Sequence, residues 1–333
     1  MADDPVLSVR SLSVQFRIGR SWHAATRNVD FDLYPNETLA LVGESGCGKS
    51  ITCQSILGLL PKSVSRIEGS IRYRGREIAT LSETELERIR GKEIAMIFQE
   101  PMTALNPVMP VGDQIAESLA IHLGLGRARA RTEAIAFMDR VRIPAPEKRF
   151  RDYPHQFSGG MRQRIVIAMA MACNPRVLLA DEPTTALDVT IQAQILAELR
   201  SLSSRFNMSM IFITHSMGVV AAIADRVAVM YAGEIVETAP AERLFAAPRH
   251  PYTRALFQAI PRVDRHAVNL RPIPGQVPSI TEFPSGCRFA PRCPFCRACC
   301  IETTPPLLPV AGTQDHRVAC LLVEKTAGKE IIP

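Results

Sequence analysis

Gly43-Glu-Ser-Gly-Cys-Gly-Lys-Ser50 carries most of the structural prediction for this chain. It fits the pattern G-x-x-x-x-G-K-[ST], and it lies between a short apolar segment, residues 38–42, and a helical pattern that runs from Lys49 to about Leu60. Glycines let backbone N–H groups turn inward around phosphate oxygens, and a helix start adds partial positive charge. We therefore predict a nucleotide phosphate loop in which Lys49 reaches the β- and γ-phosphates and Ser50 binds Mg²⁺.

Two adjacent acids, Asp181 and Glu182, follow a second short apolar segment, residues 177–180. Ligands bind at the carboxyl ends of strands in α/β sheets. In this position Asp181 is expected to hold Mg²⁺, and Glu182 is the candidate general base for an attacking water. A strand that ends in Asp-Glu is, taken alone, more often a solvated strand end. The phosphate loop upstream is what favours a functional role.

Short apolar segments alternate with helical patterns over most of the chain. Strands are predicted at 6–16 (as an edge strand), 29–33, 38–42, 70–73, 94–98, 177–180, 210–214 and 228–231, and helices at 49–60, 111–140, 158–172 and 191–202. This order predicts an α/β fold with parallel strands covered by helices on both faces. A helical insert at about 100–170 interrupts the pattern and suggests an inserted subdomain.

Composition restricts the class of protein. The 333 residues suffice for one large α/β domain and a smaller appendage, and 47% of them are hydrophobic. The formal net charge of +6 is too diffuse to indicate DNA binding. No run of 18 or more apolar residues exists, and the start of the chain, with Asp3 and Asp4, lacks the pattern of a secretory signal. We expect a cytoplasmic protein.

Six of the nine cysteines lie between Cys287 and Cys320. In a reducing compartment such a cluster indicates a metal site before it indicates disulfides. Cys287, Cys293, Cys300 and Cys320 have the spacing C-x5-C-x6-C-x19-C, which does not separate an iron–sulfur cluster from zinc or from spare thiols. Two further cysteines, at 296 and 299, leave the choice of ligands by spacing ambiguous.

Residues 157–161, Phe-Ser-Gly-Gly-Met, lie between the two nucleotide motifs. Together these motifs resemble the ATP-binding cassette (ABC) family over nearly the whole chain. Two cassettes of that family pair head to tail, so the resemblance implies that Ser158 and Gly160 contact the γ-phosphate held by a partner. Phe157 and Met161 replace the usual Leu and Gln of this signature, and the Met form is familiar in the peptide-importer branch.

The resemblance assigns roles to single residues as well. Gln99 looks like the glutamine-loop residue that contacts Mg²⁺, and His215 looks like the switch histidine that bonds to the γ-phosphate. Asp188 lies in the loop that crosses the dimer interface in the family, and Phe16 is where members stack an aromatic ring on adenine. The resemblance implies a catalytic group of Glu182, His215, Lys49 and Gln99. It places Ser50, Gln99 and Asp181 at Mg²⁺. The implied nucleotide-contacting set is Phe16, Gly43, Glu44, Ser45, Gly46, Cys47, Gly48, Lys49, Ser50, Ile51, Gln99, Ser158, Gly159, Gly160, Asp181 and Asp188.

The tail of the chain resembles one branch of the family. Residues 250–253 (His-Pro-Tyr-Thr), 273–279 and 286–294 are similar to the C-terminal extension of dipeptide and oligopeptide importer ATPases. Several members of that branch carry a [4Fe–4S] cluster, which the resemblance places at Cys287, Cys293, Cys300 and Cys320. The family pattern selects Cys300 over Cys299, and zinc stays the alternative.

The resemblance implies a P-loop NTPase cassette with a mixed RecA-like core, an N-terminal antiparallel β-subdomain, a helical signature subdomain and a small irregular Cys-rich extension. The expected domains are 1–260 and 261–333. The expected activity is ATP hydrolysis that powers an importer of di- or oligopeptides. Its partners would be a second cassette subunit, the same or different, two membrane permeases and an extracytoplasmic solute-binding protein, and no nucleic acid.

Such a subunit would act at the cytoplasmic face of the inner membrane. Two alternatives for its function stay open. The same machinery could import nickel chelates, opines or glutathione, or the chain could be a soluble cassette ATPase outside transport. Soluble cassette ATPases commonly fuse two cassettes, whereas this chain has one phosphate loop and one signature.

Overall fold

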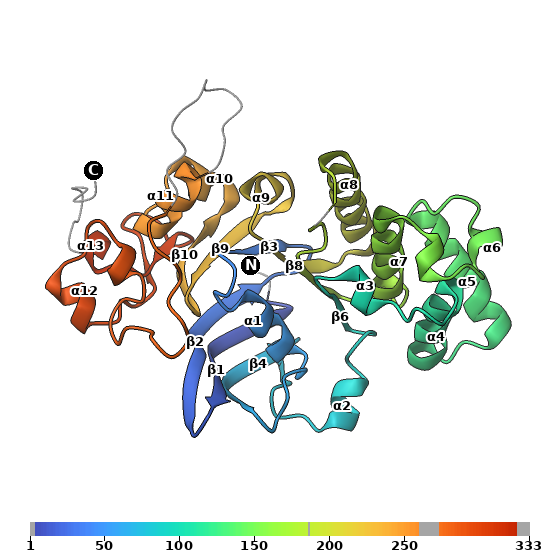
Figure 1. Ribbon diagram of the computed structural model, residues 1–333, viewed down its shortest axis with the longest axis horizontal. Coiled ribbons are helices and arrows are strands. Elements are labelled where there is room, and N and C mark those ends of the chain that lie inside the picture. Colours follow the sequence, from blue (N-terminus) through green and yellow to red (C-terminus); the bar gives the residue numbers. More distant parts are fainter. Residues whose placement is uncertain (1–3, 186, 260–272, 325–333) are drawn as a thin grey trace. The chain divides into compact units, whose positions relative to one another are not determined.

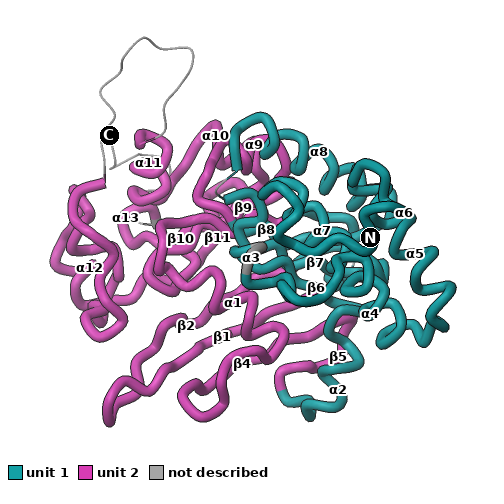
Figure 2. Tube along the Cα trace, turned by 45° about the vertical axis from the view of Figure 1, so that its right-hand side comes forward, with its two compact units in different colours: residues 1–6, 33–38, 80–213 teal, residues 7–32, 39–79, 214–333 magenta. Residues whose placement is uncertain are grey.

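The computed structural model describes residues 4–185, 187–259 and 273–324. The chain divides into two compact units, each built from several stretches of sequence and drawn in separate colours in Figure 2. Unit 1 contains residues 33–38 and 80–213 with the N-terminus, and unit 2 contains residues 7–32, 39–79 and 214–333. Among the described residues, no helix has both the length and the apolar character needed to span a bilayer.

Unit 2 contains a four-stranded antiparallel sheet in the order β2-β1-β4-β5. Its strands are β1 (Leu7–Ile18), β2 (Ser21–Leu33), β4 (Ser65–Tyr73) and β5 (Arg76–Glu77). The alternating residues Leu7, Val9, Leu12 and Val14 are all 0% exposed. The prediction of an edge strand at 6–16 was wrong, because β1 lies between β2 and β4. Alternation reveals a buried face but not whether both edges are paired.

Five further strands of unit 2 lie in the order β11-β12-β10-β9-β3; β10, β9 and β3 are labelled in Figure 1. The buried strand β3 (Thr38–Val42) pairs in parallel with β9 (Arg226–Tyr231), and β10 (Glu234–Pro240) pairs antiparallel with β9. Helices α1 (Lys49–Ile56) and α9 (Met217–Ile223) belong to the same unit. The predicted helix at 49–60 ends early, and Gly58 then adopts φ +60.

The chain after β10, from residue 241 onward, is called the C-terminal extension below, and it contributes short strands to the same sheet. The short strands β11 (Leu308–Pro309) and β12 (Arg317–Val318) continue it beyond β10, with Glu237 opposite Val318. The short helical segments are α10 (Ala241–Ala246), α11 (Pro251–Gln258), η2 (Ala290–Arg292), α12 (Ala298–Glu302) and α13 (Leu321–Glu324). Residues far beyond the phosphate loop in sequence are thus part of its sheet.

A buried carboxylate anchors the extension to β10. Glu237 is 0% exposed and accepts three hydrogen bonds: from His316 Nε2 at 2.7 Å, from the Arg249 N–H at 2.7 Å and from the His250 N–H at 2.9 Å. His250 in turn accepts the Tyr252 N–H at the start of α11, and burial lowers the pKa of His250 to about 4. A buried charge of this kind is tolerated only with such partners.

Unit 1 combines three parallel strands with a helical region. Its strands are β6 (Ile94–Ile97), β7 (Val177–Asp181) and β8 (Ser209–Thr214), in the order β8-β7-β6 and with β7 in the middle. Its helical segments are α2 (Glu83–Glu87), α3 (Pro101–Ala104), α4 (Val111–Leu123), α5 (Arg127–Arg140), α6 (Pro146–Arg149), η1 (Pro154–Gln156), α7 (Gly159–Met171) and α8 (Val189–Phe206).

The predicted helix over 111–140 is two helices, since Gly124 ends α4 in the left-handed conformation, φ +65. Helices α4, α5 and α7 contact one another in the green part of the chain in Figure 1. The guanidinium of Arg164 in α7 pairs with Glu198 in α8, and these side chains are 9% and 7% exposed.

Candidate nucleotide-binding site

The phosphate loop, residues 43–48, joins β3 to α1 in unit 2, and its backbone requires glycine. Gly43 and Gly48 have φ angles of +154 and +101. A Cβ on Gly43 would lie 2.1 Å from the Met230 carbonyl oxygen, and one on Gly48 would lie 3.1 Å from Thr26 Cγ2. Because neighbouring strands leave no room for a side chain, the loop forms a concave backbone cradle of the kind that holds phosphate.

Lys49 points back into this cradle. Its Nζ donates to the Gly43 carbonyl at 2.8 Å and to the Glu44 carbonyl at 2.9 Å, and the residue is only 5% exposed. The Cys47 thiol lies 3.5 Å from the same ammonium group; burial raises its pKa, although the charge of Lys49 acts in the opposite direction. A buried ammonium at a helix start can exchange loop carbonyls for phosphate oxygens.

The rest of the predicted loop set lies around this cradle. Ser45 and Gly46 are exposed, while Ser50 and Ile51 are half-buried at the start of α1. Phe16, the predicted adenine-stacking residue, is half-buried on β1 opposite Ser65 in the antiparallel sheet.

The two predicted carboxylates end the central strand of unit 1. Asp181 is the last residue of β7 and is 4% exposed. Glu182 follows in the left-handed region with φ +46, and its N–H donates to the Ile213 carbonyl of β8 at 3.1 Å. The turn directs the chain away from the strand right after Asp181, and such strained conformations gather at functional sites.

Glu182 is held by two side chains. Its Oε2 accepts from Thr185 Oγ1 at 2.9 Å and from Gln99 Nε2 at 3.2 Å. Gln99 is the predicted glutamine-loop residue, so the structure brings together two members of the predicted set. Thr185 was missed by the sequence reasoning. The sequence feature that could have indicated Thr185 is its position three residues after Glu182. In a tight turn, this spacing brings the Thr185 hydroxyl close to the Glu182 carboxylate.

The signature residues lie at helix starts in unit 1. Ser158 is exposed and caps α7, with its Oγ accepting the Met161 N–H at 3.4 Å. Gly159 is exposed, and a Cβ on Gly160 would lie 2.8 Å from Ile191 Cγ2. Exposed N–H groups at such a helix start suit an anion.

Asp188 caps α8 in the same manner, with Oδ1 accepting the Ile191 N–H at 2.9 Å, and it is exposed. His215 follows β8, is exposed and belongs to unit 2 together with the phosphate loop. The carboxylates, Gln99 and the signature residues belong to unit 1.

The four predicted cysteine ligands line one cavity in unit 2. Its walls include Cys287, Cys293, Cys300 and Cys320, together with His250, Phe289 and Leu322. The other two tail cysteines, 296 and 299, are not in that lining, and all nine cysteines are free thiols. Among the residues described, no group of three or more His, Cys, Asp or Glu side chains could hold a metal ion.

Backbone amides point at these sulfurs. The N–H groups of Phe289, Phe295 and Arg297 donate to Cys287, Cys293 and Cys300, and those of Leu322 and Val323 donate to Cys320. Burial raises the pKa of Cys287 to about 12 and that of Cys293 to about 11. Buried thiols of this kind are poor nucleophiles, whereas amide donors to sulfur suit a thiolate that binds iron.

A glycine-walled phosphate loop and a strand-end carboxylate pair define a nucleotide-binding cassette of the P-loop class. Comparison with known proteins agrees with this class. Residues 26–185 match the family model "ABC transporter", and residues 236–300 match "Oligopeptide/dipeptide transporter, C-terminal region". The dimeric structure of MJ0796, described as a bacterial ABC transporter cassette, has a TM-score of 0.63 and 25% identity, and covers 71% of this chain and 98% of its own.

Relatives match over almost the entire length. The dipeptide transport ATP-binding protein DppD of Bacillus subtilis is 48% identical over 330 residues, which cover 99% of this chain and 98% of the relative. A Brucella abortus protein, whose name proposes a peptide import ATP-binding protein, is 51% identical over 313 residues, 94% of each chain. The chain therefore belongs to the ABC transporter ATPases, in their oligopeptide/dipeptide branch.

Proposed function

We propose that this chain hydrolyses ATP to power the import of dipeptides or oligopeptides. The match of residues 236–300 to the C-terminal region of oligopeptide/dipeptide transporters is the observation that carries the proposal. The name of the Bacillus subtilis relative, which describes dipeptide transport, supports it. Nickel chelates, opines and glutathione are alternative solutes for the same machinery.

In this proposal Lys49 and the loop N–H groups hold the β- and γ-phosphates, and Ser50, Asp181 and Gln99 hold Mg²⁺. Glu182 accepts a proton from the attacking water, with Thr185 and Gln99 fixing its carboxylate. His215 bonds to the γ-phosphate. Catalysis then consists mostly of positioning and charge stabilisation, as in other phosphoryl transfers.

ABC cassettes dimerise and work with permease subunits. For this chain we propose a head-to-tail pair, with the same or a related subunit, in which Ser158 and Gly160 complete the partner's nucleotide site and Asp188 lies at the interface. The exposed residues Ser158 and Gly159 at the start of α7 support this, since the partial positive charge of a helix start suits an anion. An isolated cassette would then bind ATP and hydrolyse it poorly.

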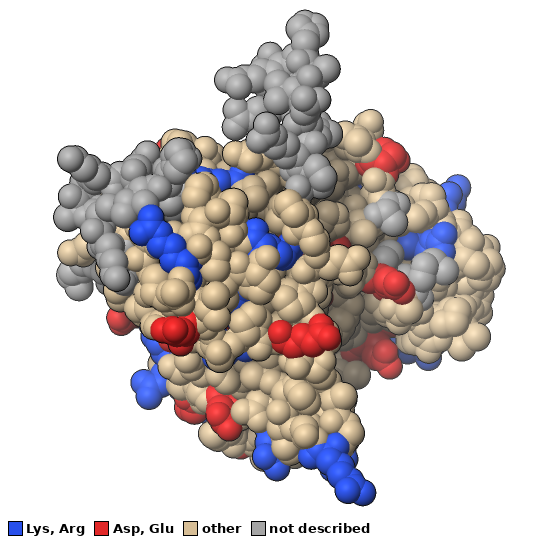
Figure 3. Space-filling model, turned by 60° about the vertical axis from the view of Figure 1, so that its left-hand side comes forward, with Lys and Arg blue, Asp and Glu red and all other residues tan. Residues whose placement is uncertain are grey.

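The remaining proposed partners are two integral-membrane permeases and an extracytoplasmic solute-binding protein, with this chain at the cytoplasmic face of the inner membrane. Acidic and basic side chains are interspersed on the face drawn in Figure 3, rather than gathered into one basic field of the kind that binds nucleic acid. Co-purification with two membrane proteins tests the assignment. A cassette that never co-purifies with them would favour a role outside transport.

Glu182→Gln tests the chemistry. We expect it to remove ATP hydrolysis and to trap a dimer with bound ATP, which gel filtration with radiolabelled ATP would detect. Glu117→Gln, an exposed acid on α4, is the matched control and should leave both properties unchanged. Hydrolysis at the wild-type rate in Glu182→Gln would refute the role of Glu182 as base.

For the cysteine cavity we propose a structural [4Fe–4S] cluster bound by Cys287, Cys293, Cys300 and Cys320, with zinc as the alternative. Each of the four iron atoms of such a cluster takes one thiolate ligand, so the ligands must surround a cavity, as these four cysteines do. Backbone N–H donors to the sulfurs suit thiolates of this kind. Such a cluster would cross-link segments of the extension. Iron, sulfide and zinc analysis with an absorbance spectrum after anaerobic purification is the test; Cys296→Ser should keep the metal and Cys293→Ser should lose it.

A further inference from the structure

Glu44, the second residue of the phosphate loop, is bound by an arginine of the extension. Arg292 donates from Nη1 to Glu44 Oε2 at 2.8 Å and from Nη2 to Glu44 Oε1 at 3.1 Å, which is a two-point guanidinium–carboxylate pair. The Arg292 side chain is only 4% exposed. Its Nε also donates to the Pro274 carbonyl at 2.8 Å, so its position is fixed within the extension.

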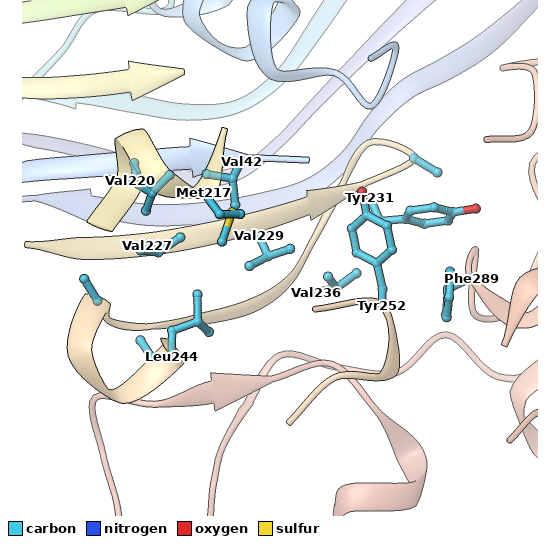
Figure 4. Close-up of a cluster of buried hydrophobic side chains, with 14 residues drawn as sticks. Val42, Met217, Val220, Val227, Val229, Tyr231, Val236, Leu244, Tyr252 and Phe289 are labelled. Carbon is cyan, nitrogen blue, oxygen red and sulfur yellow. The ribbon is translucent and has the colours of Figure 1, made fainter. Parts of the chain in front are cut away.

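A second contact holds the same loop residue from a different element. The Glu44 N–H donates to Tyr252 Oη, in α11, at 2.9 Å. Tyr252 packs against Tyr231 with ring centroids 4.6 Å apart and against Phe289 at 5.4 Å, and all three are buried (Figure 4). Phe289 also lines the cysteine cavity. The side chain and the N–H of Glu44 are thus both engaged by residues outside the loop.

We propose that Arg292 is a positioning residue for ATP binding: by pairing with Glu44, it neutralises a carboxylate beside the phosphate cradle and fixes the backbone of the loop. The inference rests on the proposed binding of ATP at residues 43–50.

The physical reason is the sign of the charges. ATP brings several negative charges to a loop that carries a carboxylate of its own, and like charges repel strongly where water is partly excluded. With Arg292 in place, the loop presents Lys49 and backbone N–H groups to the phosphates, and the negative charge of Glu44 is compensated. Without Arg292 the carboxylate is uncompensated and can turn toward the ligand. Neutralising Glu44 itself should then remove the penalty.

The test is a double-mutant cycle on the full chain, with equilibrium titration of a fluorescent, non-hydrolysable ATP analogue and Mg²⁺. We expect Arg292→Met to weaken binding roughly tenfold, the order of the repulsion between ATP and one uncompensated carboxylate in a partly solvated site. The Glu44→Gln/Arg292→Met double variant should regain most of the wild-type affinity. A role of Arg292 limited to folding the extension predicts no such rescue, so the rescue distinguishes the two.

Arg288→Met is the matched control. Arg288 is also a buried arginine of the extension, but it contacts the Ala232 carbonyl and Glu234 instead of the phosphate loop. Its variant should lose thermal stability, and Glu44→Gln should not alter that outcome. Arg292→Gln keeps a donor for the Pro274 carbonyl without the charge; it should behave as Arg292→Met does and serves as a second variant if the Met form does not fold.

Metal content needs control, because Arg292 precedes Cys293. Iron and zinc are measured in every variant after anaerobic purification. The proposal is supported if, at constant metal content, the affinity for the ATP analogue falls when the Glu44 charge is left uncompensated and recovers when that charge is removed. Three results would each overturn the proposal. The Arg292 variants could bind ATP with wild-type affinity, or the double variant could bind it as weakly as the single variant. The third such result is an ATP affinity that changes only with metal content. A wild-type chain that binds no ATP would instead refute the proposed function itself.

Discussion

Replacing Glu237 should release the C-terminal extension from the sheet of unit 2. Its two carboxylate oxygens accept three donors in a fully buried setting: His316 Nε2 and the Arg249 N–H on Oε1, and the His250 N–H on Oε2. Each donor left without an acceptor costs about 1–3 kcal/mol. Relief from burying the carboxylate offsets part of that sum, so Glu237→Ala should lower the free energy of unfolding by about 3–5 kcal/mol.

The amide of Glu237→Gln gives a graded comparison. Its oxygen can still accept from His316 and Arg249, while its NH2 group must face the His250 N–H, so we expect a loss of about 1–3 kcal/mol, that of one donor left unpaired. Urea unfolding followed by the fluorescence of Trp22, the single tryptophan, measures both values, and limited proteolysis reports release of the extension. Glu242→Ala, an exposed acid on α10, is the control. Equal stability of wild type and Glu237→Ala would refute the reasoning.

Two further predictions concern the nucleotide motifs. Gly43→Ala should abolish ATP binding in a filter-binding assay, because its Cβ would lie 2.1 Å from the Met230 carbonyl oxygen. Gly46→Ala has no atom within 4 Å of the added Cβ, so it should still bind, with a penalty of about 1–2 kcal/mol from its positive φ. Similar losses in both variants would contradict the steric argument. Thr185→Val should lower kcat for ATP hydrolysis with little change in KM, because it removes the 2.9 Å hydrogen bond that orients Glu182. Thr185→Ser keeps the hydroxyl and should restore kcat. An unaltered kcat in the valine variant would exclude that orienting role.

Local motifs were predictable because their geometry is set by neighbours in sequence. The glycines of the phosphate loop, the strand before Asp181 and the serine that caps α7 each follow from a few adjacent residues. The cysteine cavity was predictable only through the family resemblance, because spacing left 299 and 300 equivalent. The structure distinguishes them, since Cys300 lines the cavity and Cys299 does not.

Long-range pairs were not predictable from one sequence. Arg292 and Glu44 are 248 positions apart, and His316 and Glu237 are 79 apart. Arg and Glu are ordinarily solvated surface residues and His is intermediate in burial, so no pattern marks which of them will meet a buried partner. The placement of β1 failed for a related reason, because one of the strand's partners comes from a later segment of the chain.

The extension therefore has a physical connection to the phosphate loop. A buried ion pair adds little stability compared with apolar packing, because desolvation offsets the attraction of the charges. The Arg292 side chain is 4% exposed and that of Glu44 30%, so their pair adds little to the attachment of the extension, which the Glu237 anchor already provides. What the pair supplies in addition is a fixed direction for a carboxylate in the phosphate loop. In our proposal, an extension that folds correctly sets in this way the charge that ATP meets.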